Sequence, residues 1–293
     1  MNYRSLGRSD LSVSEISFGC MSLGTDQNAN TALLLKAYES GINFFDTADL
    51  YDKGWNEETV GIALRPVRDN VIIATKVGNQ WRKDGSGWDW NPTKKHILKA
   101  VEESLRRLKT DYIDLYQLHG GTIEDPIDEA IEAFELLKEQ GKIREYGISS
   151  IRPNVIREWV KKSKLSSVMM QYSLLDRRPE EESLDLLHEH KISVITRGSL
   201  AKGMLVDKAP KDYFGYTAEQ VEKLQNAVQK AGNPVGVSLQ FVLQHPAVAS
   251  AVTGIRTNAQ LESVISGMKN VVSGLGYNGL TKLVKPNVYE LHR

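Results

Sequence analysis

Residues 41–61 read GINFFDTADLYDKGWNEETVG, and they set a pattern that the rest of the chain repeats. The apolar run from Ile42 to Phe45 is typical of a buried strand, and it stops at the carboxylate of Asp46. Tyr51 follows in a loop, and a helix begins at the acidic residues 56–58. This stretch therefore predicts a strand, a loop and a helix, with a carboxylate at the end of the strand and a phenol in the loop.

The same alternation continues along the chain. Strands are predicted at residues 16–18, 43–46, 71–75, 113–118, 143–148, 168–170, 192–196 and 249–253. Helices are predicted at residues 30–40, 57–64, 93–108, 127–140, from 153 onward, and at 180–190, 217–231, 235–244 and 258–268. Strands that alternate with helices indicate a parallel sheet, and eight such units indicate a closed (β/α)₈ TIM barrel.

Segments at the two ends complete the predicted architecture. Residues 2–14 alternate around a turn at residues 7–10, which predicts an N-terminal β-hairpin ahead of the barrel. Residues 269–293 predict an irregular C-terminal tail that either crosses the barrel mouth or wraps the surface. With no linker or low-complexity segment between these parts, we expect residues 1–293 to form a single α/β barrel domain.

Composition excludes several classes of protein. Lys and Arg together number 37, as do Asp and Glu, so the formal net charge is zero, which argues against a nucleic-acid or anionic-membrane partner. Cys20 is the only cysteine, so no intramolecular disulfide forms. The sequence contains neither a signal-peptide pattern nor an apolar run of the roughly 20 residues that a membrane helix needs. We therefore expect a cytoplasmic protein, with no metal site and no predicted oligomer.

Reactive side chains follow the predicted strands. In a barrel of this kind, the active site lies at the carboxyl ends of the strands. The residues at those ends are Asp46, Lys76, His119, Ser149, Gln171, Arg197 and Gly254, with Tyr51 just beyond. Taken alone, each position is better explained as a polar residue at the point where an apolar strand meets water. A carboxylate, an ammonium, an imidazole and a phenol at one face favour a catalytic site.

These four groups suit one kind of chemistry. A tyrosine with a pKa near 10 is a poor acid at neutral pH, and a nearby ammonium lowers that pKa. Lys76 would supply the ammonium, and Asp46 would keep it charged and in position. His119 would donate a hydrogen bond to a substrate oxygen and direct it toward Tyr51. The arrangement predicts that Tyr51 protonates a carbonyl oxygen while a cofactor delivers hydride.

Seven segments carry a resemblance to a known family. They are INFFDTADLY, IIATK, DYIDLYQLH, KIREYGISS, QYSLL, TRGSLAKG and TGIRTNAQLE, in this order and spacing. Through them the chain resembles the aldo-keto reductase superfamily, as a bacterial aldo/keto reductase, over essentially its whole length. The resemblance implies a (β/α)₈ barrel that binds NADPH in an extended form without a Rossmann domain. No strand-linked GxGxxG motif is present, which agrees with that implication.

The resemblance also implies roles for individual residues. The catalytic tetrad falls on Asp46, Tyr51, Lys76 and His119. The cofactor-binding positions are Ser149, Ser150 and Gln171 at the nicotinamide carboxamide, Arg197 at the nicotinamide face, Gly198, Ser199, Leu200 and Lys202 at the pyrophosphate, and Gly254, Arg256, Thr257 and Gln260 at the adenosine 2′-phosphate. Because a guanidinium pairs well with phosphate, Arg256 favours NADPH over NADH.

The chain departs from the family pattern at three of its cofactor positions. Ser150 stands where the family commonly has Asn, so the second carboxamide contact is lost or bridged by water. Ser263 and Val264 stand where Glu and Asn usually face the adenine, which weakens the expected adenine contacts. The tetrad itself shows no departure.

The sequence thus predicts an NADPH-dependent reductase that converts the carbonyl of a small aldehyde or ketone to an alcohol. Two alternatives remain: an NADPH-binding sensor or auxiliary subunit with little turnover, and a barrel lyase that uses Lys76 as a Schiff-base nucleophile. The tryptophan-rich loop at residues 79–91 is interpreted equally well as a hydrophobic substrate wall or as a set of anchors on the barrel rim. A further segment, residues 204–216, is a candidate to fold over the cofactor.

Overall fold

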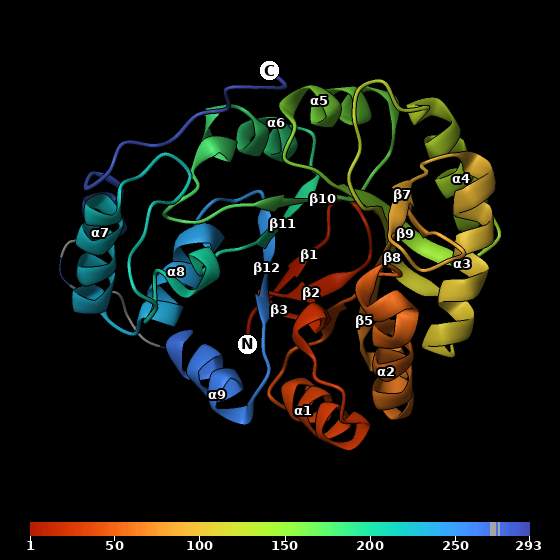
Figure 1. Ribbon diagram of the computed structural model, residues 1–293, viewed down its shortest axis with the longest axis horizontal. Coiled ribbons are helices and arrows are strands. Elements are labelled where there is room, and N and C mark those ends of the chain that lie inside the picture. The colour runs from red at the N-terminus through yellow and green to blue at the C-terminus, as the bar shows by residue number, and fades with distance from the viewer. Residues whose placement is uncertain (270–273, 275) are drawn as a thin grey trace.

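The structure, a computed structural model, describes residues 1–269, 274 and 276–293. Eight parallel strands form a closed barrel, and β12 pairs with β3 to close it (Figure 1). The barrel strands are β3 (Ile16–Gly19), β4 (Phe44–Asp46), β5 (Ile72–Val77), β8 (Ile113–Leu118), β9 (Ile143–Ser149), β10 (Ser167–Gln171), β11 (Ser193–Arg197) and β12 (Val248–Gly254). The predicted (β/α)₈ barrel is therefore confirmed.

Helices surround the strands as an outer layer (Figure 1). They are α1 (Gln27–Glu39), α2 (Trp55–Leu64), α3 (Lys94–Leu108), α4 (Ile127–Glu139), α5 (Pro153–Lys162), α6 (Ser183–Glu189), α7 (Ala218–Ala231), α8 (Pro234–Leu243) and α9 (Asn258–Gly267). The sequence predicted one helix at residues 180–190. The structure instead has a 3₁₀ helix at Arg178–Glu181 followed by α6. The division falls at Glu182, whose φ of −158° lies outside the helical region.

Sequence-local signals explain why individual helices begin where they do. The Thr93 side chain accepts a hydrogen bond from the His96 backbone N–H and so caps the start of α3. Thr217 and Gln220 form a reciprocal capping box at the start of α7. Each cap accepts a hydrogen bond from a backbone N–H that the first helical turn leaves free. The caps therefore set the residues at which α3 and α7 begin.

A small antiparallel hairpin, β1 (Tyr3–Ser5) with β2 (Ser12–Ser14), precedes the barrel as predicted. Its apolar residues Leu6, Leu11 and Val13 are buried in the barrel interior against strand residues such as Phe44. Gly7 in its turn has φ of +62°, and a Cβ there would lie 2.4 Å from the Ser166 carbonyl oxygen, so a side chain has no room. The hairpin therefore closes the amino-terminal end of the barrel and leaves only the opposite end open.

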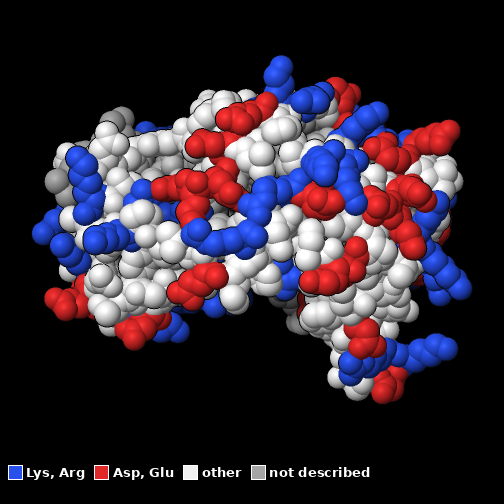
Figure 2. Space-filling view, turned by 90° about the horizontal axis from the view of Figure 1, so that it is seen from above, with Lys and Arg blue, Asp and Glu red and all other residues white. Residues whose placement is uncertain are grey.

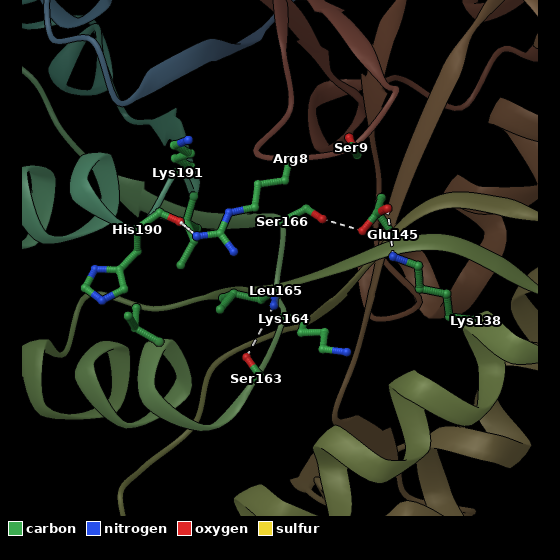
Figure 3. Close-up of a pocket in the computed structure, with 12 residues that line it drawn as sticks. Arg8, Ser9, Lys138, Glu145, Ser163, Lys164, Leu165, Ser166, His190 and Lys191 are labelled. Carbon is green, nitrogen blue, oxygen red and sulfur yellow. Dashed lines mark hydrogen bonds and ion pairs between the residues drawn. The ribbon is translucent and has the colours of Figure 1, made fainter.

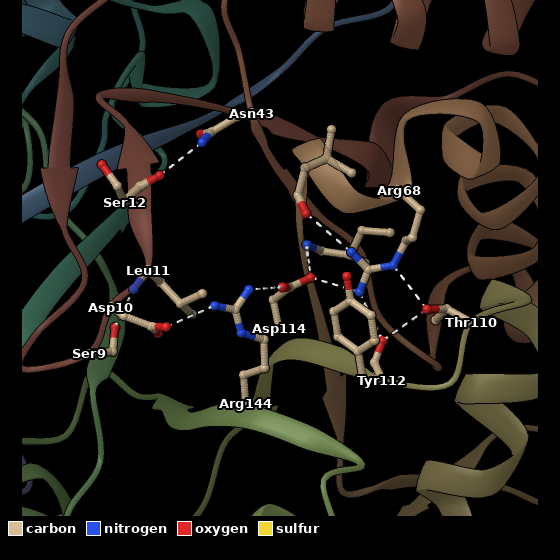
Figure 4. A network of polar contacts seen from close by, with 12 residues as sticks. Ser9, Asp10, Leu11, Ser12, Asn43, Arg68, Thr110, Tyr112, Asp114 and Arg144 are labelled. Carbon is tan, nitrogen blue, oxygen red and sulfur yellow. Dashed lines mark hydrogen bonds and ion pairs between the residues drawn. The ribbon is translucent and has the colours of Figure 1, made fainter.

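A buried ionic network ties this closed end together (Figure 4). The Asp114 side chain on β8 is fully buried, 2.8 Å from Arg68 and 3.1 Å from Arg144. It also accepts a hydrogen bond from the Ile73 N–H on β5, and Arg144 reaches Asp10 in the hairpin turn at 3.2 Å. Two guanidinium groups and a backbone donor thus compensate the buried charge, and the network serves to join the strands to the hairpin.

A hollow of about 280 Å³ also lies at the closed end, between the hairpin turn and the loops before β10 and β11 (Figure 3). Its cationic side chains do not converge on one point. Arg8 donates to the His190 carbonyl oxygen at 2.9 Å, and Lys138 pairs with Glu145 at 2.8 Å. Figure 3 shows Lys191 extending away from Arg8. We interpret this hollow as a junction between loops.

Two segments differ from their prediction in detail. Residues 79–91 contain a second hairpin, β6 (Asn79–Trp81) with β7 (Trp88–Trp90), that the sequence did not predict. The predicted irregular tail contains a short helix, α10 (Gly276–Thr281), and its residues 270–273 and 275 lie outside the described residues. The tail then follows the outer surface, where the Tyr289 N–H donates to Glu181 and the His292 carbonyl accepts from the Asn154 N–H. Its described end therefore wraps the surface.

Charged residues of both signs are interspersed on the face shown in Figure 2, as the zero net charge would suggest. Across residues 1–269, 274 and 276–293, none of the helices has the length and apolar character needed to span a membrane.

Candidate active site

A cavity of about 610 Å³ opens at the carboxyl-terminal end of the barrel, where the strands end. Its wall contains most of the residues that the sequence predicted for the site. These are Asp46, Tyr51, Lys76, His119, Ser149, Ser150, Gln171, Arg197, Gly198, Lys202 and Gly254. The parallel register places the ends of β4, β5, β8, β9, β10, β11 and β12 around this one opening. Asp46 and Gly254, which are 208 residues apart in the sequence, therefore line the same cavity.

Lys76 and Asp46 form a buried ion pair at the floor of this cavity. Lys76 Nζ lies 2.7 Å from Asp46 Oδ2 and donates to the Thr47 carbonyl oxygen at 2.6 Å. Burial alone would lower the pKa of Lys76, but the attraction and hydrogen bonding of Asp46 and Tyr51 outweigh it, so the pKa is raised. Burial raises the pKa of Asp46, and the Lys76 ammonium opposes that rise. The pair holds Lys76 in its charged form.

This charge state bears on the lyase alternative. A Schiff base forms by attack of a neutral amine, which enzymes obtain by lowering the pKa of a lysine. In this structure the pKa of Lys76 moves in the opposite direction, and its ammonium donates to two oxygen atoms. The geometry therefore argues against Lys76 as a nucleophile.

Tyr51 begins the 3₁₀ helix Tyr51–Gly54, in the loop after β4. Lys76 Nζ lies 5.1 Å from the centroid of its ring. Burial raises the pKa of Tyr51, and the Lys76 ammonium opposes the rise without reversing it. The sequence predicted that Lys76 would lower this pKa; the net direction is upward because removal from water has the larger effect. Tyr51 therefore carries its proton at neutral pH.

His119 follows β8 and faces Tyr51. The two rings meet edge to face, with centroids 5.8 Å apart and an interplanar angle of 81°. Burial, with the nearby charges of Lys76 and Arg197, lowers the pKa of His119 to about 3. Its buried Nδ1 has no hydrogen-bond partner within the part of the chain that the structure describes. His119 is thus a neutral imidazole that carries one N–H donor.

We expect this neutral state to persist across the physiological pH range. An NMR titration of the imidazole signals should show no midpoint for His119 between pH 5 and 8, the signal being assigned by its absence in His119→Asn. Because the folded pKa is depressed, the unfolded state takes up this proton first. Stability should therefore fall as pH drops below about 6.5, the ordinary value for histidine, toward 3. A midpoint near the ordinary value would contradict the burial argument.

The other side of the cavity presents amide and guanidinium groups. Arg197 Nη1 donates to Gln171 Oε1 at 3.1 Å, and Gln171 Nε2 donates to the Tyr213 hydroxyl at 3.3 Å. The Ser150 hydroxyl accepts from the Arg152 backbone N–H at 3.2 Å, so it takes part in the local turn. Together with Ser149 at the end of β9, these groups offer both hydrogen-bond donors and acceptors on this side of the cavity.

Three of the four residues predicted for the adenosine 2′-phosphate, Arg256, Thr257 and Gln260, lie at or just before the start of α9 and do not line the cavity. The Thr257 side chain caps α9 by accepting from the Gln260 N–H, and Gln260 Oε1 accepts from the Arg256 N–H at 2.7 Å. The Arg256 side chain is exposed, with no carboxylate partner among the described residues. A helix amino terminus beside such a guanidinium has the donor set that a phosphate requires. The local chemistry therefore fits the phosphate end of a nucleotide.

Three other residues near the cofactor positions face the interior. Ser199 is 2% exposed, and its hydroxyl lies 3.1 Å from the Thr196 hydroxyl. Leu200 packs against the core, and Val264 on α9 is buried in it. The Val264 side chain is consequently unavailable to face an adenine, whereas Ser263 beside it is partly exposed.

The cavity also contains residues that the sequence did not single out. They come from loops and strand ends, and include Met21, Leu50, Ile151, Arg152 and Tyr213. Tyr213 lies in the segment 204–216 that was a candidate for this position. The remaining loop residues carried no signal, because a loop side chain has no periodic pattern that reveals its direction.

The tryptophan-rich loop behaves as an anchor at one position. Trp90 Nε1 lies 3.0 Å from both carboxylate oxygens of Asp125, and its ring fills the space beside Gly78. Among the described residues that line the cavity there is no tryptophan. The anchor interpretation is therefore favoured for Trp90, and the substrate wall is not supported.

A parallel barrel whose open end holds a carboxylate, an ammonium, a phenol and a neutral imidazole has the groups that a barrel oxidoreductase would use. Comparison with known proteins agrees, because the sequence model described as "Aldo/keto reductase family" matches residues 15–283. The chain belongs to the aldo/keto reductase family.

Three relatives illustrate this membership. The chain is 50% identical to "Uncharacterized oxidoreductase YqkF" of Bacillus subtilis (strain 168), with 100% of each chain covered. It is similar to the solved structure "aldo-keto reductase AKR11C1 from Bacillus halodurans (holo form)", at 48% identity and a TM-score of 0.96, over 100% of this chain and 99% of that one. It is also 32% identical to "NADH-specific methylglyoxal reductase" of Escherichia coli (strain K12), over 71% of this chain and 70% of that protein.

Proposed function

We propose that this oxidoreductase reduces the carbonyl of a small aldehyde or ketone with NADPH. One observation supports this more than any other: Tyr51, charged Lys76 and neutral His119 meet at the floor of a single open cavity. A protonated phenol beside a neutral imidazole is suited to donating to a carbonyl oxygen. The membership in the aldo/keto reductase family supports the same reaction class.

In this proposal each residue has a distinct role. Tyr51 donates its proton to the developing alkoxide, and His119 donates a hydrogen bond that orients the substrate oxygen. Lys76 stabilises the phenolate that remains on Tyr51, and Asp46 keeps Lys76 charged and in place. When bound, the reduced nicotinamide supplies hydride to the carbonyl carbon.

The same proposal assigns residues to the cofactor. Ser149, Ser150 and Gln171 would hold the carboxamide, with Arg197 at the nicotinamide face. Gly198, Ser199, Leu200 and Lys202 would follow the pyrophosphate, Ser199 and Leu200 through their backbone. Gly254, Arg256, Thr257 and Gln260 would receive the adenosine end. The similarity to a relative whose structure is described as a holo form supports a bound cofactor.

The choice between NADPH and NADH tests the role of Arg256. One relative is described as NADH-specific, so family membership alone does not decide this choice. We expect Arg256→Gln to weaken NADPH binding by roughly 10-fold or more, because a charge-assisted bond to phosphate contributes about 1.5–3 kcal/mol. NADH lacks that phosphate, so its dissociation constant should hardly change. Fluorescence titration with both nucleotides measures the two effects, and equal loss for both would contradict the assignment.

A turnover assay with a panel of aldehydes tests the reaction itself. Oxidation of NADPH should follow addition of the aldehyde and yield the matching alcohol in equal amount. Tight nucleotide binding without turnover would instead favour the sensor alternative. No binding of either nucleotide would overturn the proposal.

A further inference from the structure

Arg152 is a cation at the open cavity that the proposed reaction does not use. It directly precedes α5, and it lines the cavity together with Tyr51 and His119. Its Nη1 donates to the Gly121 carbonyl oxygen at 2.5 Å, which fixes the guanidinium beside the loop that follows β8. Gly121 lies two residues after His119 and has φ of +130°, a conformation that favours glycine. Arg152 is thus held near the residue that would orient the substrate oxygen.

The carboxylates of this loop do not neutralise Arg152. Asp125 accepts from Trp90 Nε1 at 3.0 Å and from the Thr122 N–H at 2.7 Å, so its oxygens are engaged. Glu124 is fully exposed; its pKa is lowered mainly by hydrogen bonds to its own backbone and to Thr122, and less by Arg152. Within the described residues Arg152 has no ion pair, and its Nε and Nη2 have no hydrogen bond. Two donors of a rigid guanidinium therefore remain available.

The other cations of the cavity already have partners or roles. Lys76 is paired with Asp46. Arg197 donates to Gln171, and both Arg197 and Lys202 belong to the cofactor side in the proposed function. Arg152 lies at the carboxyl ends of β8 and β9, on the side of the cavity that also holds His119. It is the cation that remains for the substrate among those that line the described cavity.

We propose that Arg152 binds a carboxylate on the carbonyl substrate, so that the protein prefers small aldehydes or ketones that carry one. The inference rests on the proposed function, because it names the substrate class for the same site. A guanidinium with two free donors matches the two oxygens of a carboxylate. Met21, Leu50 and Ile151 also line this cavity, and their apolar side chains suit the hydrocarbon part of such a substrate.

Two aldehydes of the same shape and different charge test this inference. We would measure kcat/KM for 4-carboxybenzaldehyde and for 4-formylbenzamide with NADPH. The wild-type protein should favour the acid by about 10- to 100-fold, the effect of a charge-assisted hydrogen bond. Arg152→Gln should remove this preference, chiefly through KM, while Arg152→Lys should keep part of it. The rate with the amide should change by less than about threefold in either variant.

Arg157 on α5, the helix that Arg152 directly precedes, provides a matched control. Its guanidinium pairs with Glu182 and lies outside the cavity, so Arg157→Gln should keep the preference for the acid. Thermal unfolding of each variant shows whether it is folded. Equal wild-type rates for the two aldehydes would overturn the inference. The inference would also be overturned if Arg152→Gln lowered kcat/KM equally for both aldehydes and weakened NADPH binding, because Arg152 would then bind the cofactor.

A binding comparison separates this inference from the proposed function. The alcohols 4-(hydroxymethyl)benzoate and 4-(hydroxymethyl)benzamide are titrated by tryptophan fluorescence, with and without NADPH, and no turnover is needed. If the wild-type protein binds the benzoate more tightly than the benzamide, and Arg152→Gln does not, the inference is supported. Failure to reduce either aldehyde would overturn only the proposed function. Equal binding of both alcohols would overturn the inference.

Discussion

Replacing Tyr51 by Phe is expected to lower kcat for carbonyl reduction by about 10²- to 10⁴-fold, the usual contribution of a positioned general acid. The substitution removes only the hydroxyl group. The phenyl ring keeps its edge contact with His119 and its position beside Lys76, so the cavity should retain its shape. Steady-state kinetics with a simple aldehyde and NADPH measures the loss.

Two further measurements make this result specific. The dissociation constant for NADPH should stay within about threefold of the wild-type value, because no cofactor contact is assigned to the hydroxyl. Tyr3→Phe is a matched control: it removes a phenolic hydroxyl that donates to the Gly41 carbonyl oxygen, away from the cavity. An equal loss of NADPH binding in Tyr51→Phe would mean that Tyr51 is structural and that the proton donor is a different group.

Replacing Asp46 by Asn should produce the largest loss of stability among the changes considered. The side chain of Lys76 is 1% exposed, and the substitution removes the counter-ion of its buried ammonium group. Breaking a buried pair from one side typically costs about 3–5 kcal/mol of unfolding free energy. The pKa of Lys76 should fall as well, because burial lowers it once the attraction of Asp46 is gone. Urea denaturation measures the first effect.

A surface pair of similar length is the control for this second prediction. Lys36 and Glu262 lie 2.8 Å apart, but both side chains are exposed, so Glu262→Gln should cost about 0–1 kcal/mol. The double variant Asp46→Asn with Lys76→Met should recover part of the stability, since it removes the uncompensated charge. Equal costs for the buried and the surface change would show that burial does not determine the contribution of the pair.

The barrel and the floor of its cavity could be predicted because both follow from repeated local patterns. Each strand is a short apolar run, and the residue at its carboxyl end points toward the mouth once the strands are parallel. Asp46, Lys76 and His119 could be predicted from strand ends in this way, and Tyr51 from its place in the loop after Asp46. Their mutual contacts agree with the predicted grouping.

The parts that could not be predicted depend on contacts between distant loops. Arg152 is directed by a hydrogen bond to Gly121, and Trp90 by one to Asp125, and neither spacing has a periodic signal. Burial of Val264 follows from how α9 packs on the barrel, which a family pattern does not specify. The sequence could reveal the charge of Lys76, which lowers the pKa of Tyr51, but not how deeply Tyr51 is buried. Burial has the larger effect, so the pKa is raised.

The hairpin that closes the barrel makes folding depend on both ends of the chain. Arg4 donates to the Val248 carbonyl oxygen, 244 residues away, and β3 pairs with β12 at Ile16 and Ala251. Contacts of such sequence separation form slowly, because a long loop must close before they stabilise the structure. During synthesis, Leu6, Leu11 and Val13 leave the ribosome long before strands that cover them, such as β11 and β12, exist. The apolar side chains of the hairpin therefore stay uncovered until β11 and β12 have been made, which leaves them open to aggregation in that interval.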